Sequence, residues 1–276
     1  LMRAAVFQSR TGIDPDANAA RLLAAMAEAK AGGADMLFTP EMSGLLDQDR
    51  KRAAPHLCEE ADDRVLAAVR DAARHHGLWV HLGSLALKGG SDGRLVNRGF
   101  VIDDKGAIRA RYDKIHLFDV DLPTGESWRE SVAYAPGERS VIATTPWARI
   151  GLSICYDMRF PDLYRALSDA GAELLSVPAA FTVPTGKAHW HVLLRARAVE
   201  AGAFVIAAGQ CGQHDDGRST FGHSLVVDPW GEVLLDMGDD VGVGFADIDL
   251  GRLADVRARV PALRHRRPIG AVETCV

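Results

Sequence analysis

The chain has 276 residues and a mass of 29.7 kDa, with 47% hydrophobic and 25% charged residues, an ordinary globular composition with enough chain for a large core. The net charge of −5 gives no basic field for nucleic acid, and the sequence has no apolar run of 18 residues, so we expect neither a signal peptide nor a membrane span. Four cysteines without a CxxC pair indicate a reducing compartment, so we expect a cytoplasmic protein.

In the first half of the chain, short apolar runs alternate with amphipathic stretches. Residues 18–31 predict an alanine-rich helix with Asn18 as its N-cap, and residues 62–76 predict a second helix. The turn Asp104-Lys105-Gly106 predicts a hairpin between the last two strands of this half. The expected strands are 3–8, 35–39, 78–87, 98–103 and 107–111.

The second half of the chain repeats this alternation. Helices are expected over 162–170, 187–201 and 253–260. Strands are expected over 141–144, 148–154, 173–177, 204–208, two within 224–235, and 243–248. Strands with intervening helices predict the α/β class, and the hairpins predict mixed sheets. Because no linker, repeat or low-complexity tract interrupts the pattern, we expect one domain over residues 1–276.

Cys155 stands where a strand is expected to turn sharply into a helix. The predicted strand 148–154 ends at this residue, and Pro161 opens the helix that follows. A side chain on such an elbow is held rigidly, remains accessible to substrate and can face backbone N–H groups, which suits a nucleophile. The alternative is a buried structural cysteine, because free cysteine packs like a small hydrophobic residue.

Two more polar residues follow strand-like segments. Glu41 comes after Phe38-Thr39-Pro40, and Lys114 lies in Tyr112-Asp113-Lys114-Ile115-His116-Leu117. In α/β folds, ligand sites gather at the carboxyl ends of strands, where side chains point into a common crevice. Taken singly, each residue could equally be an ordinary solvated surface charge.

Together these residues carry a family resemblance. The motifs are Pro40-Glu41, Tyr112-x-Lys114-x-His116-Leu117, and Gly151-x-x-x-Cys155-Tyr156-Asp157-x-Arg159-Phe160-Pro161. In order and local sequence they resemble the Glu–Lys–Cys triad of the nitrilase superfamily of carbon–nitrogen hydrolases. The segment 178–190 and the motif Leu194-Arg195-Ala196-Arg197-Ala198 resemble the Nit branch, which contains deaminated glutathione amidases and ω-amidases. The resemblance implies a four-layer α-β-β-α sandwich.

The chemistry of these residue types fits hydrolysis of an amide. A thiol at its ordinary pKa is only a few per cent thiolate at neutral pH, so Cys155 needs a base, and Glu41 would move its proton. The Lys114 ammonium and the backbone N–H of Tyr156 would hold the oxyanion. The resemblance adds a second glutamate that orients the lysine and the substrate amide. Glu130 matches best and Glu126 is the competing choice, with a solvated loop carboxylate as the alternative for either.

Further residues are assigned to substrate on the resemblance. Arg159 matches a position that binds a substrate carboxylate, which a guanidinium fork suits; an ion pair with Asp157 or Asp162 is the alternative. Phe181 and Thr185 match positions that line the pocket, and core packing is the alternative for the aromatic ring.

No metal or cofactor is expected. His189 and His191 are two apart on a predicted helix and do not share a face, and the family resembled uses no metal. We therefore interpret them as packing residues at a helix start.

The sequence thus predicts an amidase that cleaves the C–N bond of a small carboxylated substrate, a 2-oxo acid amide or a molecule like deaminated glutathione, through a thioester. An N-carbamoyl amino acid hydrolase and a catalytically silent binding protein are the alternatives. A true nitrilase is disfavoured, because those enzymes resemble Cys-Trp-Glu where this chain has Cys155-Tyr156-Asp157. Relatives pair into dimers, so we expect a homodimer or higher oligomer with the tail from about residue 261 at the interface.

Overall fold

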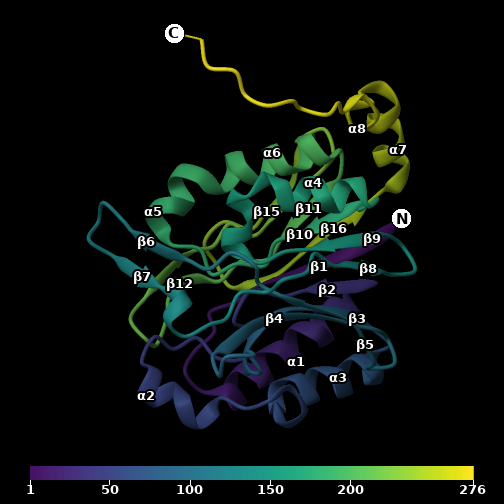
Figure 1. Ribbon diagram of the computed structural model, residues 1–276. Helices are drawn as coiled ribbons and strands as arrows, with labels where there is room; N and C mark the ends of the chain where they lie inside the picture. The colour runs from purple at the N-terminus through teal and green to yellow at the C-terminus, as the bar shows by residue number, and fades with distance from the viewer. Residues whose placement is uncertain (276) are drawn as a thin grey trace.

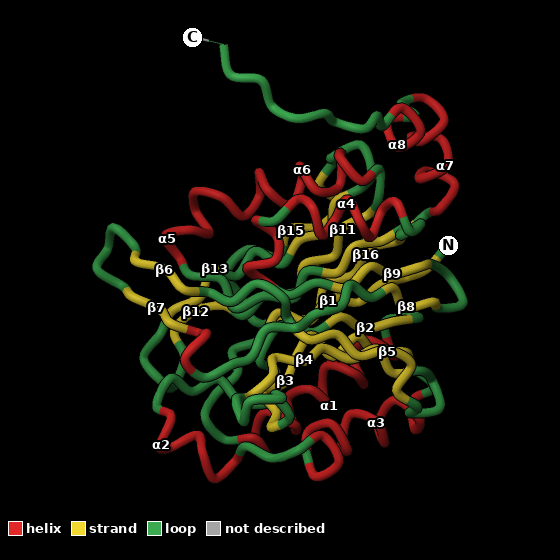
Figure 2. The backbone as a smooth tube through the Cα atoms, in the orientation of Figure 1, coloured by secondary structure: helices red, strands yellow, loops and turns green. Residues whose placement is uncertain are grey.

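Two six-stranded sheets pack face to face between two pairs of helices in the computed structural model, which describes residues 1–275 (Figure 1). One sheet is covered by α1 and α3, and the other by α4 and α6 (Figures 1 and 2). This layering confirms the expected four-layer α-β-β-α sandwich. The four covering helices are α1 (Pro15–Ala31), α3 (Arg64–His76), α4 (Pro161–Asp169) and α6 (His191–Ala201).

The first sheet has the strand order β16-β1-β2-β3-β4-β5. Neighbouring strands from β1 to β3 run parallel, and β16, β4 and β5 are added antiparallel to their neighbours. The sheet is therefore mixed, as the hairpins predicted. Its strands are β1 (Met2–Gln8), β2 (Met36–Phe38), β3 (Trp79–Lys88), β4 (Leu95–Ile102), β5 (Ile108–Asp113) and β16 (Gly242–Ile248).

The second sheet repeats this plan in the order β15-β14-β11-β10-β9-β8. Strands β9, β10 and β11 are parallel, and β8, β14 and β15 are antiparallel to their neighbours. Its strands are β8 (Ile142–Thr144), β9 (Arg149–Leu152), β10 (Leu174–Ser176), β11 (Phe204–Ala207), β14 (Leu225–Val227) and β15 (Val233–Asp236).

The alternation of side chains along β1 divides the core into two clusters. Met2, Ala4 and Val6 contribute to the cluster that includes the interior between the sheets, whereas Ala5 and Phe7 pack in the cluster with α1 and α3. Because successive residues of a strand point to opposite faces, a strand buried on both faces reads as a continuous apolar run. Burial of each large apolar side chain away from water contributes about 1.5–3 kcal/mol to the free energy of unfolding.

The start of α1 differs from the sequence prediction. The helix begins at Pro15 with Asp14 as N-cap, whose side chain accepts a hydrogen bond from the Asp16 N–H at 2.9 Å. Asn18 is buried within the first turns, where its amide bonds to the backbone of Gly12 and Gly44. The prediction that Asn18 caps this helix was therefore wrong. Pro15 has the fixed φ that suits a first helical residue, and Asp14 is the N-cap.

The helix predicted over 187–201 is longer and less regular than expected. It begins with α5 (Val183–Thr185), continues as a π-helical stretch over Gly186–Trp190 and becomes α6 at His191. Such π stretches are rare and often occur at functional sites. Here it places the buried Trp190 between Phe181 and the backbone of His223.

The remaining elements are short and lie outside the layers. Two hairpins were not predicted, β6 (Asp119–Asp121) with β7 (Ser127–Arg129), and β12 (Cys211–Gln213) with β13 (Ser219–Phe221). The other helices are α2 (Arg50–Ala53), α7 (Leu250–Arg259), α8 (Ala262–His265) and 3₁₀ turns at Ala54–His56, Glu60–Asp62, Glu130–Val132 and Cys155–Arg159. After α8 the chain extends away from the body (Figure 1). Within residues 1–275, every helix is too short or too polar for a membrane span.

Candidate active site

Glu41, Lys114 and Cys155 meet in the interior between the two sheets. Glu41 follows β2 and Lys114 follows β5 of the first sheet, whereas Cys155 follows β9 of the second. Their exposed fractions are 4%, 2% and 7%, so the solvated alternatives for Glu41 and Lys114 are wrong. The sandwich places the end of one sheet opposite the end of the other, which brings segments more than 100 residues apart into one group.

Lys114 lies between two carboxylates. Its Nζ donates to Glu41 Oε1 at 3.0 Å and to Glu130 Oε2 and Oε1 at 2.9 and 3.2 Å. Glu126 is exposed in the β6–β7 hairpin, where its backbone carbonyl accepts from the Leu122 N–H. The structure therefore brings Glu130, and not Glu126, to the lysine.

Asn97 joins the group and was not predicted. From β4, its Nδ2 donates to Glu41 Oε1 at 2.8 Å and to Glu130 Oε1 at 3.3 Å. Backbone N–H groups fix the other oxygens: Ala180 donates to Glu41 Oε2 at 2.9 Å and Phe118 to Glu130 Oε2 at 2.6 Å. The sequence signal was an amide in the apolar run Leu95-Val96-Asn97, because a buried amide needs polar partners.

Burial and charge set the protonation states of the group. Burial first, and then the negative charge of Glu41, raises the pKa of the Cys155 thiol well above its usual value, although Lys114 opposes this rise. Burial alone would lower the pKa of Lys114, but the charges of Glu130, Glu41 and Cys155 outweigh it and hold that pKa well above its usual value. The resting group therefore contains a neutral thiol beside a charged ammonium.

Cys155 occupies a sharp backbone turn. Its φ is +50°, a left-handed conformation that costs a non-glycine residue about 1–3 kcal/mol and that clusters at functional sites. Its N–H donates to the carbonyl of Pro178 at 2.8 Å, which secures the turn. Met42, next to Glu41, also has a positive φ of 56°, and Gln210 holds the Glu41 carbonyl at 2.9 Å. Both the sulfur and the carboxylate thus stand on constrained backbone.

Asp157 connects the cysteine turn to the lysine loop. Its fully buried carboxylate accepts from the Ile154 N–H at 2.9 Å and from the Tyr112 hydroxyl at 2.7 Å. It also accepts from the His116 N–H at 3.0 Å and lies 2.7 Å from His116 Nδ1. The sequence suggested Asp157 only as an ion-pair partner of Arg159, and that pairing is wrong.

Arg159 lies among aromatic rings instead. Its guanidinium carbon is 5.6 Å from the centre of the Phe181 ring and 6.0 Å from that of Tyr156, and its Nη2 is 3.2 Å from His189 Nδ1. Within residues 1–275 no carboxylate pairs with it, so the alternative partner Asp162 is wrong as well.

Phe181 and Thr185 are both buried, and Phe181 is the one of the two that contacts Arg159. The centre of the Phe181 ring lies 5.0 Å from that of Trp190. Phe181 is therefore also packed in the core, which was the alternative role expected for it. The hydroxyl of Thr185 is 2.6 Å from that of Thr182, so it is engaged within its own segment.

Comparison with known proteins agrees with this geometry. The model of the carbon–nitrogen hydrolase family matches residues 3–258. A human protein named deaminated glutathione amidase is 42% identical over 245 residues, which cover 87% of this chain and 75% of that protein. The crystal structure of the Caenorhabditis elegans NitFhit protein superposes with a TM-score of 0.89 at 38% identity, over 96% of this chain and 65% of that one.

A third relative bears on the cysteine. An amidase from Nesterenkonia, solved with acrylamide added to its active-site cysteine, superposes with a TM-score of 0.78 at 29% identity, over 95% of this chain and 98% of that one. Since a family model covers most of the chain and the identities extend along it, the motifs are not isolated matches. This chain belongs to the carbon–nitrogen hydrolase family, as the resemblance to the nitrilase superfamily implied.

Proposed function

We propose that this chain is a cysteine-dependent amidase that hydrolyses small carboxylated amides of the deaminated glutathione type. The observation that carries the proposal is the buried Lys114 ammonium, which bridges two carboxylates beside a neutral thiol. A thiol with a raised pKa can attack only if its proton is removed as the bond forms, and the Glu41 carboxylate lies near enough to raise the pKa of that thiol.

Acylation would proceed with Glu41 as base. The carboxylate takes the thiol proton while Cys155 Sγ bonds to the amide carbon, and the carbonyl oxygen becomes an oxyanion between Lys114 Nζ and the Tyr156 N–H. When the oxyanion collapses, the C–N bond breaks and Glu41 returns the proton to the departing amine or ammonia. A thioester on Cys155 remains.

Deacylation would use the same groups in reverse. Glu41 removes a proton from water as its oxygen attacks the thioester, and the oxyanion forms again beside Lys114. Collapse breaks the C–S bond, and the sulfur regains the proton from Glu41. Glu130 and Asn97 act as positioning residues, because they hold Lys114 and Glu41 without reaching the sulfur in any contact of the described residues.

The substrate carboxylate is assigned to Arg159. Its guanidinium is free of carboxylate partners within residues 1–275 and lies beside Phe181 and Tyr156, which can cover the apolar part of a short acyl chain. A planar fork donates two parallel hydrogen bonds to a carboxylate. We therefore expect Arg159→Ala to raise KM for carboxylated amides about 10- to 100-fold and to leave a neutral amide of the same length unchanged.

An amide panel tests the function. Deaminated glutathione, 2-oxoglutaramate, an N-carbamoyl amino acid and a neutral amide would be assayed for release of amine or ammonia. The proposal expects the first two to be turned over and Cys155→Ala to lose at least about 10⁴-fold in kcat. Cys58→Ala, at a free cysteine outside the site, is the matched control and should retain activity.

Three results would overturn the proposal. Preferred turnover of the carbamoyl compound would indicate the carbamoyl hydrolase instead. No turnover of any compound would favour a silent binding protein. Unchanged activity in Cys155→Ala would remove the mechanism.

We further infer a homodimer in the cytoplasm. The tail exposes Ile269 and Val272 at 83% and 92%, and α6 exposes Val192 and Val199 on its outer side. Such apolar side chains are expected to be covered by a second copy. All four cysteines are free thiols, which suits a reducing compartment. Sedimentation of the full chain and of a chain ending at residue 260 tests the role of the tail, and a monomer in both samples would contradict it.

A further inference from the structure

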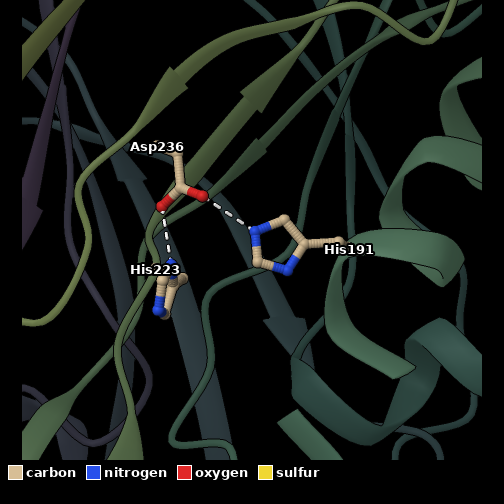
Figure 3. Close-up of side chains that lie close together, drawn as sticks. All are labelled: His191, His223 and Asp236. Carbon is tan, nitrogen blue, oxygen red and sulfur yellow. Dashed lines mark hydrogen bonds and ion pairs between the residues drawn. The ribbon is translucent and has the colours of Figure 1, made fainter. Parts of the chain in front are cut away.

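Two histidines and an aspartate meet on the outer side of the second sheet, away from the group around Cys155. His191 is the first residue of α6, His223 lies between β13 and β14, and Asp236 ends β15. Figure 3 shows both imidazole rings facing the one carboxylate. His191 Nε2 lies 2.8 Å from Asp236 Oδ2, and His223 Nδ1 lies 2.8 Å from Asp236 Oδ1.

The donor set is that of a transition-metal site. The three ligand atoms, two imidazole nitrogens and one carboxylate oxygen, lie within 4.8 Å of one another. A tetrahedral zinc ion with bonds of about 2.0–2.2 Å needs its ligands roughly 3.3–3.5 Å apart, so small rotations of the side chains suffice. Imidazole and carboxylate ligands together suit Zn²⁺ and Co²⁺ rather than Mg²⁺ or Ca²⁺.

The backbone fixes His223 in place before any ion binds. Its φ is +52°, and within residues 1–275 only Met42 and Cys155 among the other non-glycine residues have a positive φ. Its N–H donates to the Gly238 carbonyl at 2.7 Å, and its own carbonyl accepts from Trp190 Nε1 at 2.8 Å. These bonds hold an unfavourable conformation that turns the imidazole toward Asp236.

The surroundings favour a cation. A second carboxylate oxygen, Asp239 Oδ1, lies 3.4 Å from His223 Nε2, the ring nitrogen that does not face Asp236. A carboxylate on the far nitrogen of a ligating histidine fixes its tautomer and strengthens it as a ligand. The three side chains of the site are 39%, 27% and 34% exposed, so an ion can enter from solvent. Lys187 lines the adjoining cavity and opposes a cation, but it is itself exposed and can turn away.

We propose that His191, His223 and Asp236 form a binding site for a divalent transition metal such as zinc, with water in the fourth position. On binding, each imidazole gives up the proton that faces Asp236 and keeps or gains one on its other nitrogen, so the metal replaces two hydrogen bonds. The carboxylate retains its bond from the Gly238 N–H. This site departs from the expectation that the chain binds no metal: His191 would share the ion not with His189 but with His223, 32 residues further on.

A bound metal would stiffen the segments that hold Phe181, whose ring lies beside Arg159. Phe221 stacks on the His223 ring at 4.6 Å, and its N–H donates to the carbonyl of Phe181 at 2.9 Å. Trp190, which holds the His223 carbonyl, packs on the same Phe181. Metal binding thus ties α6, β15 and the β13–β14 loop together one layer behind Arg159. Metal binding at this site does not depend on the amidase reaction.

Metal titration of the full chain tests the proposal. Zn²⁺ and Co²⁺ would be added to the Cys155→Ser variant, so that the reactive thiol cannot bind them. We expect one ion per chain, a Co²⁺ spectrum without thiolate absorption and a rise in Tm with Zn²⁺. His191→Ala and His223→Ala should each weaken Zn²⁺ binding at least about 100-fold, because loss of even an outer-shell partner costs 10- to 100-fold.

Two further variants keep the test decisive. His191→Asn retains a donor to Asp236 and should fold normally while losing the metal. His75→Ala removes an exposed histidine at the end of α3 and should bind Zn²⁺ as before. Absence of stoichiometric binding, or binding that survives in His191→Asn and His223→Ala, would overturn the proposal.

Discussion

The group around Lys114 and the group around Asp236 contain similar parts, but burial makes them different. In the first, an ammonium sits between two carboxylates with about 2% of its surface exposed. In the second, two imidazoles share one carboxylate with a quarter or more of each side chain exposed. Water screens the second group, whereas the first must balance its charges internally.

The difference shows which chemistry each place can support. In the buried group each charge shifts its neighbours, so the thiol stays neutral and the lysine stays charged. In the exposed group, the imidazole protons exchange with water, and a metal ion from solution can replace them. The buried group suits proton transfer during a reaction, and the exposed group suits reversible binding.

The largest effect is expected from removing the buried cation. Lys114→Met leaves Glu41 and Glu130 facing each other, and breaking a buried pair costs about 3–5 kcal/mol of unfolding free energy. Loss of an oxyanion donor lowers kcat about 10²- to 10³-fold. Denaturant unfolding and steady-state kinetics measure both effects.

Two variants accompany this measurement. Arg259→Met, in an exposed pair with Asp255, should leave the stability unchanged. The double variant Lys114→Met with Glu130→Gln should recover stability, because it removes the repulsion between the Glu41 and Glu130 carboxylates. It should not recover kcat, because the ammonium that would donate to the oxyanion is still missing. An equal loss of stability in Lys114→Met and Arg259→Met would show that burial does not make the Lys114 ion pairs more important than an exposed pair.

An intermediate effect is expected at Asp157, which holds the cysteine turn to the lysine loop. Asp157→Asn leaves at least one buried donor among Ile154, His116 and Tyr112 without an acceptor, at a cost of about 1–3 kcal/mol. The cysteine turn would shift, so kcat should fall while KM changes little.

Asp228→Asn is the matched control for this position. Asp228 is also buried and accepts two backbone N–H bonds and one hydrogen bond from Arg252 Nε at 3.0 Å, but it lies in the turn between β14 and β15. It should lose a similar stability with no change in kcat. An equal loss of kcat in both variants would show that Asp157 acts only through general stability.

The smallest effect concerns pH. Burial and the Glu41 charge raise the pKa of Cys155 above its ordinary value of 9.0, so the folded chain keeps the thiol protonated where the unfolded chain ionises it. The stability from this group is complete below about pH 9 and is lost as pH rises, by up to about 1.4 kcal/mol per pH unit. The free energy of unfolding should therefore decrease more between pH 8 and pH 10 in the wild type than in Cys155→Ala. An equal decrease in the two proteins would contradict the raised pKa of Cys155.

The sequence predicted the parts that local pattern controls. Apolar runs and helix periodicity located the main strands and helices, and motif order predicted that Glu41, Lys114 and Cys155 would meet at strand ends. Glu130 was the better match of two acidic residues, and the structure brings it to the lysine.

What the sequence missed depends on contacts between distant segments. Asn97 donates to glutamates 56 and 33 positions away, and His191 contacts Asp236, 45 positions later in the chain. Asp157 lies within the cysteine motif, but its partners became visible only when β5 and β9 were placed on facing sheets. Local sequence propensity does not predict such contacts between residues that are distant in the chain.

In the proposed mechanism, Cys155 carries the acyl group between two half-reactions. Two amides with the same acyl part and different leaving amines would be hydrolysed in the presence of hydroxylamine, which competes with water for a thioester. A common intermediate predicts the same ratio of hydroxamate to acid for both substrates, with both products absent in Cys155→Ala. A ratio that depends on the leaving amine, or products that persist in the alanine variant, would show that the two substrates share no thioester on Cys155.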